Sequence, residues 1–375
     1  WLSDFALFRV LRAQFDEAPW WEWPSALANR EITALAKARN TFRDAIEVER
    51  FAQFLFFTQW NALRNHASRA GIRLLGDLPI FVAHDSADVW AERKYFKLDR
   101  RGQPSVVAGV PPDYFSEDGQ LWGNPLYAWR VHADDNFRWW TRRIETQLAL
   151  YDLFRIDHFR GFAAHWEIPA DARTAKGGKW VTGPGEQFFT ALREEFGPLP
   201  LVAEDLGVIT PDVATLLEAV GVPGMKVMQF AFGGGATNPY LPENHVDNCV
   251  VYSGTHDNDT THAWFETLSP SEKQDVAKAL HVEPMALPEA VIDAALGSCA
   301  KLAMLPLQDV LGLGAGHRMN TPGTVDGNWS WRVRSDQLTP AVCEATRAKL
   351  HTHGRILSEA EAAESSPAKQ VRAGS

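Results

Sequence analysis

The sequence predicts an α/β fold in which parallel strands close into a (β/α)8 barrel of the TIM type, with helical and loop insertions. Short apolar runs typical of buried strands alternate with longer segments of helical periodicity along the 375 residues. This alternation favours a parallel sheet surrounded by helices. Polar and acidic residues gather where the apolar runs end, and in such barrels the carboxyl ends of the strands carry the active site.

Six segments have the composition of strands. Each is short, rich in Val, Ile, Leu or Phe, and bounded by Gly, Pro or charged residues. A closed barrel of this type has eight strands, and nothing before residue 44 has a strand pattern. We therefore predict that the first two strands are missing from this chain. The predicted strands are residues 72–82, 153–157, 199–204, 225–231, 249–255 and 302–308.

Helices are predicted from apolar periodicity and from capping residues. Residues 44–70 form one long helix, closed by a glycine. A helix begins at Thr210, whose hydroxyl can cap it and which is followed by a proline suited to the first turn. Ser269 and Glu272 have the spacing of a capping box that opens another helix. The apolar positions of the long helix include Val48, Phe51 and Leu55.

The chain divides into three predicted regions. Residues 1–71 are a helical insertion subdomain and the helix that leads into the barrel. Residues 72–357 carry barrel strands three to eight. Within them, residues 85–127 lack periodicity and are rich in Gly, Pro and aromatic residues, and so long an irregular segment is usually functional. Residues 358–375 have little apolar content and are predicted to be disordered.

Charge and composition narrow the classes of partner. Lys and Arg number 37 against 47 Asp and Glu, so the formal net charge is −10, and the chain has no basic block. We therefore expect neither nucleic acid nor a membrane surface as a partner. No apolar run approaches the length of a membrane span, and no signal peptide is visible.

Cysteine usage predicts a reducing compartment. Cys249, Cys299 and Cys343 are odd in number, widely spaced and free of any C-x-x-C motif, which argues against a disulfide scaffold or a zinc site. We expect a cytoplasmic protein. Because the chain begins with Trp1 rather than Met, a preceding targeting segment, including one for a plastid, stays open.

Arg155 and Asp157 are the pair around which the functional prediction is built. They lie two positions apart on the predicted strand 153–157, so their side chains share one face. A neighbouring guanidinium favours the ionised carboxylate and lowers the pKa of Asp157, which suits an anionic nucleophile. The alternative for an isolated pair is a structural salt bridge at a strand end.

Asp157, Glu204 and Asp257 follow three different predicted strands, so a barrel would gather their carboxylates over one pocket. Retaining glycoside chemistry needs one carboxylate that attacks the anomeric carbon and one acid that protonates the leaving oxygen. Crowding by neighbouring carboxylates would keep that acid protonated near neutrality. A third carboxylate beside His256 can bind sugar hydroxyls. Taken singly, each acid has the alternative of a helix cap or a salt bridge.

Several blocks of the sequence resemble the amylomaltases, the 4-α-glucanotransferases of glycoside hydrolase family 77. The resemblance runs from Trp1 to about Arg334, with the blocks in the family's order. It implies a retaining transferase of starch or glycogen metabolism that acts on maltooligosaccharides and other α-1,4-glucans and needs no cofactor or metal. The blocks are residues 76–90, 111–127, 154–161, 203–207, 224–232, 254–258 and 320–331.

The resemblance also implies a role for individual residues. Asp157 would be the nucleophile, Glu204 the acid/base and Asp257 the transition-state stabiliser. Arg155 and His256 would support them. The other implied substrate-binding residues are Asp77, Arg318 and Asn320, together with Tyr114, Phe115 and Trp122, which match the loop that covers the donor site.

The chain departs from the family pattern at its start. Complete amylomaltases begin with two barrel strands and a block containing Ser-Pro-Tyr, and this sequence has neither. We therefore expect an N-terminally truncated fragment of a longer enzyme. Two alternatives to the transferase stay open: a glucan-binding protein that is inactive because its barrel is incomplete, and an α-glucan hydrolase in which water accepts the glycosyl group.

Overall fold

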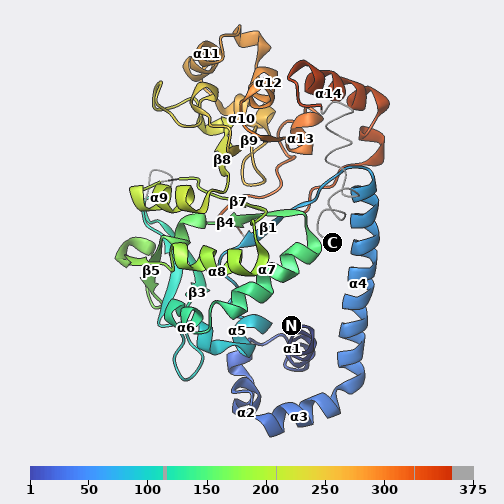
Figure 1. Ribbon diagram of the computed structural model, residues 1–375, viewed down its shortest axis with the longest axis vertical. Coiled ribbons are helices and arrows are strands. Elements are labelled where there is room, and N and C mark those ends of the chain that lie inside the picture. The colour runs from blue at the N-terminus through green and yellow to red at the C-terminus, as the bar shows by residue number, and fades with distance from the viewer. Residues whose placement is uncertain (113–115, 208, 325, 357–375) are drawn as a thin grey trace. The chain divides into compact units, whose positions relative to one another are not determined.

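The computed structural model describes residues 1–112, 116–207, 209–324 and 326–356 (Figure 1). The chain groups into two compact units, Trp1–Gly221 and Val222–Ser375, each with a parallel sheet of its own. The tail predicted to be disordered, residues 358–375, lies outside the described residues.

Helices make up the start of the first unit. Helix α1 (Leu2–Gln14) packs against α4 (Arg43–Arg69) and α5 (Ala87–Ala91). The rings of Phe8, Trp23 and Trp90 lie with centroids 5.4 to 6.0 Å apart and form the aromatic core of this region. The shorter helices here are η1 (Trp20–Glu22), α2 (Ser25–Ala28), α3 (Ile32–Thr41) and η2 (Arg93–Tyr95).

The predicted long helix is confirmed as α4, which extends along the unit in Figure 1. Its apolar positions are nevertheless exposed: Val48 is 68%, Phe51 59% and Leu55 41% accessible to solvent. Helical spacing therefore identified the element, whereas the described residues do not bury the face that the spacing marks.

A parallel sheet forms the centre of the first unit. It pairs residue 77 with residue 155 and residue 156 with residue 203, in the strand order β1-β4-β7. Tyr151 packs directly on β1, where a Cβ at Gly76 would lie 2.3 Å from its ring. The strands are β1 (Leu75–Pro79), β4 (Leu153–Asp157) and β7 (Leu201–Ala203), and the helices after β1 and β4 are α6 (Trp129–Asp134), α7 (Arg138–Leu150) and α8 (Glu186–Phe196).

Aromatic packing anchors the turn that follows β4. This turn is the 3-10 helix η3 (Phe159–Phe162). The Phe162 ring lies 4.6 Å from that of Phe188 on α8 and 5.6 Å from that of Trp140 on α7, and all three side chains are fully buried. The backbone immediately after Asp157 is thereby held against two helices.

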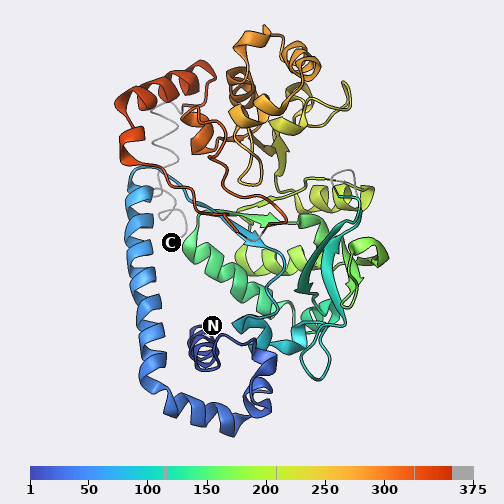
Figure 2. The same cartoon turned by 180° about the vertical axis from the view of Figure 1, so that it is seen from behind.

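The sequence prediction missed an antiparallel sheet in the first unit. Residues 85–127, predicted to lack regular structure, contain α5 and two strands of this sheet, whose order is β3-β2-β5-β6 (Figure 2). The interior glycine Gly109 and the irregular register between Val107 and Gly109 obscure the period-2 pattern that predicts a strand. The strands are β2 (Val106–Val110), β3 (Gln120–Pro125), β5 (Ala164–Pro169) and β6 (Lys179–Thr182), with η4 (Ala175–Gly177) before β6.

The second unit has a parallel sheet with the order β10-β9-β8. Its core is built from Met228, Val251, Val276 and Val291, all at most 1% exposed. The strands are β8 (Gly224–Val227), β9 (Cys249–Tyr252) and β10 (Leu302–Met304). The helices are η5 (Met228–Phe230), η6 (Pro242–Asn244), α10 (Thr261–Thr267), α11 (Pro270–Ala279), η7 (Pro284–Ala286), α12 (Glu289–Gly297), α13 (Leu307–Val310), η8 (Ser335–Gln337) and α14 (Pro340–Thr352).

Helix starts follow the predicted capping only in part. The capping box of α11 is confirmed, since Ser269 Oγ accepts from the Glu272 amide at 3.3 Å and Glu272 accepts from the Ser269 amide at 2.8 Å. Thr210 precedes α9 (Pro211–Val220) as predicted, but its hydroxyl makes no cap bond to the helix. It accepts instead from Arg160 Nη2 at 3.3 Å.

All the predicted parallel strands are present, and most are shorter than predicted. The prediction for residues 153–157 coincides with β4, whereas residues 225–231 form β8 only as far as Val227 and then turn into η5. Strands that alternate with helices in both units make the fold α/β. Within the described ranges, no helix has both the length and the apolar character needed to cross a membrane.

Candidate active site

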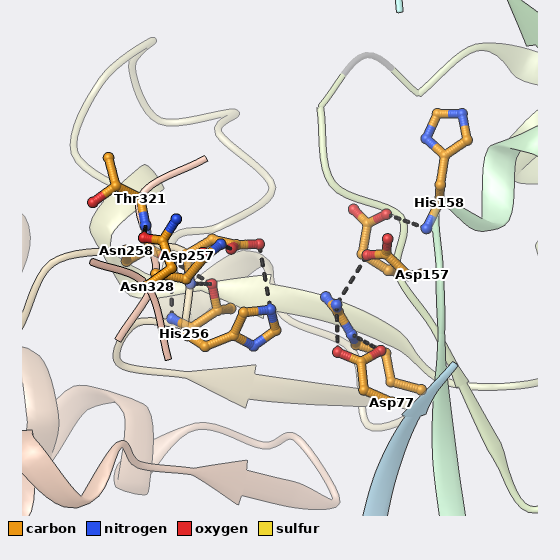
Figure 3. A network of polar contacts seen from close by, with 12 residues as sticks. Asp77, Asp157, His158, His256, Asp257, Asn258, Thr321 and Asn328 are labelled. Carbon is orange, nitrogen blue, oxygen red and sulfur yellow. Dashed lines mark hydrogen bonds and ion pairs between the residues drawn. The ribbon is translucent and has the colours of Figure 1, made fainter. Parts of the chain in front are cut away.

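Arg155 binds two carboxylates in the first unit, those of Asp77 and Asp157, which are labelled in Figure 3. Its Nε and Nη2 donate to Asp77 Oδ1 and Oδ2 at 2.9 and 2.7 Å, and Nη2 also donates to Asp157 Oδ1 at 2.9 Å. Two features of the sheet produce this arrangement. Asp77 is the register partner of Arg155 on the neighbouring strand, and Asp157 shares the face of Arg155 on β4. The predicted pairing of Arg155 with Asp157 is confirmed.

Burial and charge act in opposite directions on Arg155. Its side chain is only 7% exposed, and burial by itself disfavours the cation. The hydrogen bonds that Arg155 donates to Asp77, together with the charges of Asp77, Asp157 and Glu204, outweigh burial and raise the pKa of Arg155. Arg155 is therefore a permanent positive charge that holds two carboxylates in fixed positions.

Glu204 follows β7 and is held by backbone amides. Its Oε2 accepts from the His158 amide at 2.7 Å, and its Oε1 accepts from the Leu206 amide at 2.9 Å. The main chain adds two bonds, from the Glu204 amide to the Ile156 carbonyl at 3.0 Å and from the Phe159 amide to the Glu204 carbonyl at 3.1 Å. Glu204 is thus fixed to the residues on both sides of Asp157.

The surroundings of Glu204 raise its pKa to about 7. Burial is the largest cause and the negative charge of Asp157 is the second, while the amides of Leu206 and His158 and the charge of Arg155 act in the opposite direction. The sequence predicted the direction but attributed it to crowding by carboxylates, which ranks behind burial. A carboxyl group with this pKa is protonated in a large fraction of molecules at neutral pH.

His158 is a further site residue. It lies in the sequence block 154–161, but the sequence did not indicate a role for it. It has a left-handed backbone, with φ 55° and ψ 50°, an unusual conformation for a residue with a side chain. Figure 3 shows its imidazole pointing away from Asp157, while its amide donates to Glu204. The ring meets Trp122 edge-on with centroids 4.8 Å apart, and burial lowers the pKa of His158 to about 3, so the imidazole is neutral.

The loop after β9 in the second unit carries Asp257. Its Oδ1 accepts from Asn320 Nδ2 at 2.6 Å, and its Oδ2 lies 3.4 Å from His256 Nε2. Its carbonyl accepts from Arg318 Nη2, and Arg318 Nε donates to the Asn320 carbonyl at 2.7 Å. The Asn320 amide in turn donates to the His256 carbonyl at 3.0 Å. All four residues that the sequence predicted in this unit are therefore joined in one network.

Two neighbouring residues stabilise that loop. Asn258 Oδ1 accepts from the Thr255 amide at 2.9 Å and from the Thr255 hydroxyl at 2.8 Å, and the same hydroxyl accepts from the Asp257 amide at 3.2 Å. Trp329 lies with its ring centroid 5.1 Å from that of His256. Asn258 and Trp329 lie in the sequence blocks 254–258 and 320–331, but the sequence did not indicate a role for them.

The family model for the 4-alpha-glucanotransferases of glycoside hydrolase family 77 matches residues 1–339. The chain belongs to this family. The resemblance predicted from the sequence blocks is confirmed.

Relatives and a solved structure agree with this membership. The chain is 50% identical over 364 residues to the 4-alpha-glucanotransferase of Thermus thermophilus, covering 95% of this chain and 73% of that protein. It is 47% identical over 361 residues to the chloroplastic/amyloplastic enzyme of Solanum tuberosum, covering 95% of this chain and 62% of that protein. The amylomaltase of Streptococcus agalactiae, solved in complex with acarbose, superposes with a TM-score of 0.91 at 39% identity, covering 95% of this chain and 72% of that chain.

The remaining family residues predicted for the donor-site loop have different outcomes. Tyr114 and Phe115 lie outside the described residues. Trp122 lies on β3, is 38% exposed, and donates from Nε1 to Gln120 Oε1 at 3.0 Å. Its contact with His158 places it beside the turn that follows Asp157.

The predicted site residues that the structure describes therefore form two networks, each within one unit. The first contains Asp77, Trp122, Arg155, Asp157 and Glu204. The second contains His256, Asp257, Arg318 and Asn320.

Proposed function

We propose that the protein carrying this chain transfers a segment of an α-1,4-glucan to the 4-hydroxyl of another glucan or of glucose, with retention at the anomeric carbon. The observation that carries the proposal is the contrast between two neighbouring carboxyl groups. Asp157 is bound to the buried cation Arg155, whereas Glu204 has its pKa raised to about 7. Retaining glycosyl transfer needs one ionised and one protonated carboxyl group side by side.

In the first step, Asp157 attacks the anomeric carbon of the donor. The glycosidic bond breaks, Glu204 gives its proton to the departing oxygen, and the glycosyl group becomes an ester of Asp157. Arg155 keeps the attacking oxygen oriented, since its guanidinium is fixed from the other side by Asp77. Binding that holds reacting atoms in attack geometry lowers the barrier without new chemistry.

In the second step, Glu204 acts as a base. Its carboxylate removes the proton of the acceptor 4-hydroxyl, the oxygen attacks the anomeric carbon, and Asp157 is released. Two inversions leave the original configuration. A pKa near 7 suits both steps, because the same group must lose and regain a proton in every cycle. The amides of His158 and Leu206 hold the two oxygens of Glu204 in position for both steps.

Asp257 and His256 are proposed to bind sugar hydroxyls and to stabilise the flattened, positively charged transition state. Two contacts support this role. The side-chain amide of Asn320 holds the carboxylate of Asp257, and the Arg318 guanidinium holds the Asp257 carbonyl. A carboxylate held before the reaction stabilises developing positive charge without reorganising.

The complete protein is proposed to be a closed (β/α)8 barrel to which this chain contributes strands three to eight. Three observations support this proposal. Each unit carries parallel strands alternating with helices. The relatives from Thermus and potato are longer than the part matched here, which is 73% and 62% of them. The apolar positions Val48, Phe51 and Leu55 on α4 are exposed, and a helix with such a stripe ordinarily packs against a sheet or another helix.

The test uses the full-length protein with maltotriose as the only sugar. Transfer produces glucose together with longer oligosaccharides and no net reducing ends, whereas hydrolysis creates one new reducing end for each bond cleaved. The variant Glu204→Gln keeps the size of the side chain but cannot exchange the proton, so it should lose more than about 1,000-fold in rate. Glu194→Gln, an exposed position on α8, is the matched control and should keep full activity. Hydrolysis alone, or an active Glu204→Gln variant, would contradict the proposal.

A further inference from the structure

Trp180 is an exposed aromatic side chain on β6, the edge strand of the antiparallel sheet. Its side chain is 41% exposed. The Arg160 guanidinium carbon lies 3.9 Å from the centroid of its ring, in the geometry of a cation–π contact. The guanidinium covers part of one face of the indole, and the rest of the exposed side chain is open to a ligand.

Trp166 also contacts the Trp180 ring. Trp166 is its register partner on β5, and the two rings meet at 68° with centroids 5.2 Å apart. Trp166 Nε1 donates to the Ala175 carbonyl at 2.8 Å. Gly178 makes room for this indole, since a Cβ there would lie 2.2 Å from Trp166 Nε1. The Trp180 ring is therefore held in place by its neighbours, so its exposed part loses little side-chain entropy when a ligand binds.

The same backbone carries Trp180 and the candidate catalytic residues. Arg160 follows Asp157 by three residues, within η3. The Gly183 amide donates to the Ala163 carbonyl at 2.8 Å, which ties the end of β6 to η3. The Phe159 amide donates to the Glu204 carbonyl at 3.1 Å. Arg160 and the end of β6 link Trp180 to η3, so Trp180 lies near the candidate catalytic residues without being one of them.

We propose that Trp180 is a stacking site for a glucose unit remote from the scissile bond, and that it favours long α-1,4-glucans over short ones. This inference rests on the proposed function. A tryptophan face is apolar and wide enough to pack on the C–H face of a pyranose ring. Among the described residues, Trp180 Nε1 has no hydrogen-bond acceptor, so its N–H is available to a sugar hydroxyl.

The experiment measures kcat/KM of the full-length protein for maltotriose through maltoheptaose. In Trp180→Ala we expect the value for maltotriose to stay within about twofold of wild type and that for maltoheptaose to fall about tenfold, through KM rather than kcat. Trp180→Phe, which keeps a flat ring, should recover most of the loss. Lys179→Ala is the control, since its exposed side chain lies on the same strand but points to the other face of the sheet.

Equal losses at every chain length would overturn the inference, because they would mean that Trp180 only supports Arg160 and the catalytic frame. No loss at any length would overturn it as well. Binding separates this inference from the proposed function. The affinity of Asp157→Ala for maltoheptaose, measured by calorimetry with and without Trp180→Ala, should differ about tenfold even if the wild-type protein shows no transfer.

Discussion

Asp77 and Arg155 face each other across the β1–β4 pair, and the guanidinium binds both carboxylate oxygens of Asp77, at 2.9 and 2.7 Å. One further bond, 2.9 Å long, joins the same guanidinium to Asp157. The orientation of the proposed nucleophile therefore depends on a residue 80 positions earlier in the chain. Bidentate contacts of this kind are the strongest and most directional ion pairs in proteins.

Asp77→Asn tests this dependence. The amide keeps the shape of the carboxylate but removes its charge and one acceptor, so Arg155 should be less firmly oriented and kcat should fall about 10- to 100-fold. KM should change less than kcat. The matched control is Asp152→Asn, which alters another Asp–Arg pair of the same unit, at 3.0 Å from Arg64. A drop in kcat of similar size in the control would attribute the effect to general destabilisation.

The raised pKa of Glu204 predicts how the stability of the fold depends on pH. The folded state binds the proton more tightly than the unfolded state, so this group contributes stability at acid pH that is lost as the pH rises through about 7. Glu204→Gln removes the cost of a buried charge. The variant should therefore gain stability relative to wild type at pH 8 and gain much less at pH 5. Urea denaturation at both values measures the difference, and an equal gain at the two pH values would contradict the burial of a titrating Glu204.

The protonation of Glu204 should also control how activity depends on pH. Because the first step needs Glu204 protonated, kcat/KM should decline above about pH 7 on the basic side of the profile. Replacing His158, whose ring is neutral because burial lowers its pKa to about 3, by Asn should leave that basic limb in place. Asn tolerates a left-handed backbone better than most residues, so the amide bond to Glu204 is retained. If the basic limb of the kcat/KM profile shifts in His158→Asn, that limb reports the titration of the histidine and not of Glu204.

Asp157→Ala should abolish turnover while leaving the fold intact. Its carboxylate is 43% exposed, and Arg155 keeps its contact with Asp77. We expect a loss of at least about 1,000-fold in kcat with little change in melting temperature. With an α-maltosyl fluoride donor, added azide should enter the vacated space and give the β-linked glycosyl azide. A variant that keeps a tenth of the wild-type rate would mean that another residue is the nucleophile.

Trp122→Ala should shift the reaction toward hydrolysis. The indole is 38% exposed and packs edge-on against His158, beside the turn that follows Asp157. A flat aromatic there can stack on the acceptor sugar and exclude water from the glycosyl ester. The ratio of new reducing ends to total bonds cleaved measures the partition. We expect this ratio to rise several-fold, and an unchanged ratio would remove Trp122 from the control of acceptor choice.

The sequence by itself identified the family and the elements that carry the site. Alternation along β4 placed Arg155 and Asp157 on one face, and this pairing depends only on the period of a strand. The parallel strands were visible as short apolar runs, and these runs are continuous in β7 and β9, which are buried along their whole length. The capping box of Ser269 and Glu272 was also visible in the sequence, because its donors and acceptors lie within one turn of the chain.

Only the tertiary structure decided how the site is held together. Asp77 meets Arg155 through pairing between strands far apart in sequence. The pKa of Glu204 depends first on burial, which no local pattern encodes. His158 became visible through its left-handed backbone and its amide bond to Glu204. The antiparallel sheet was missed because Gly109 and the irregular register of the β2–β3 pair obscure the strand pattern, and because β2 pairs on its other side with β5, which lies far along the chain. Contacts between distant segments arise from packing, and a reading of neighbouring residues cannot supply them.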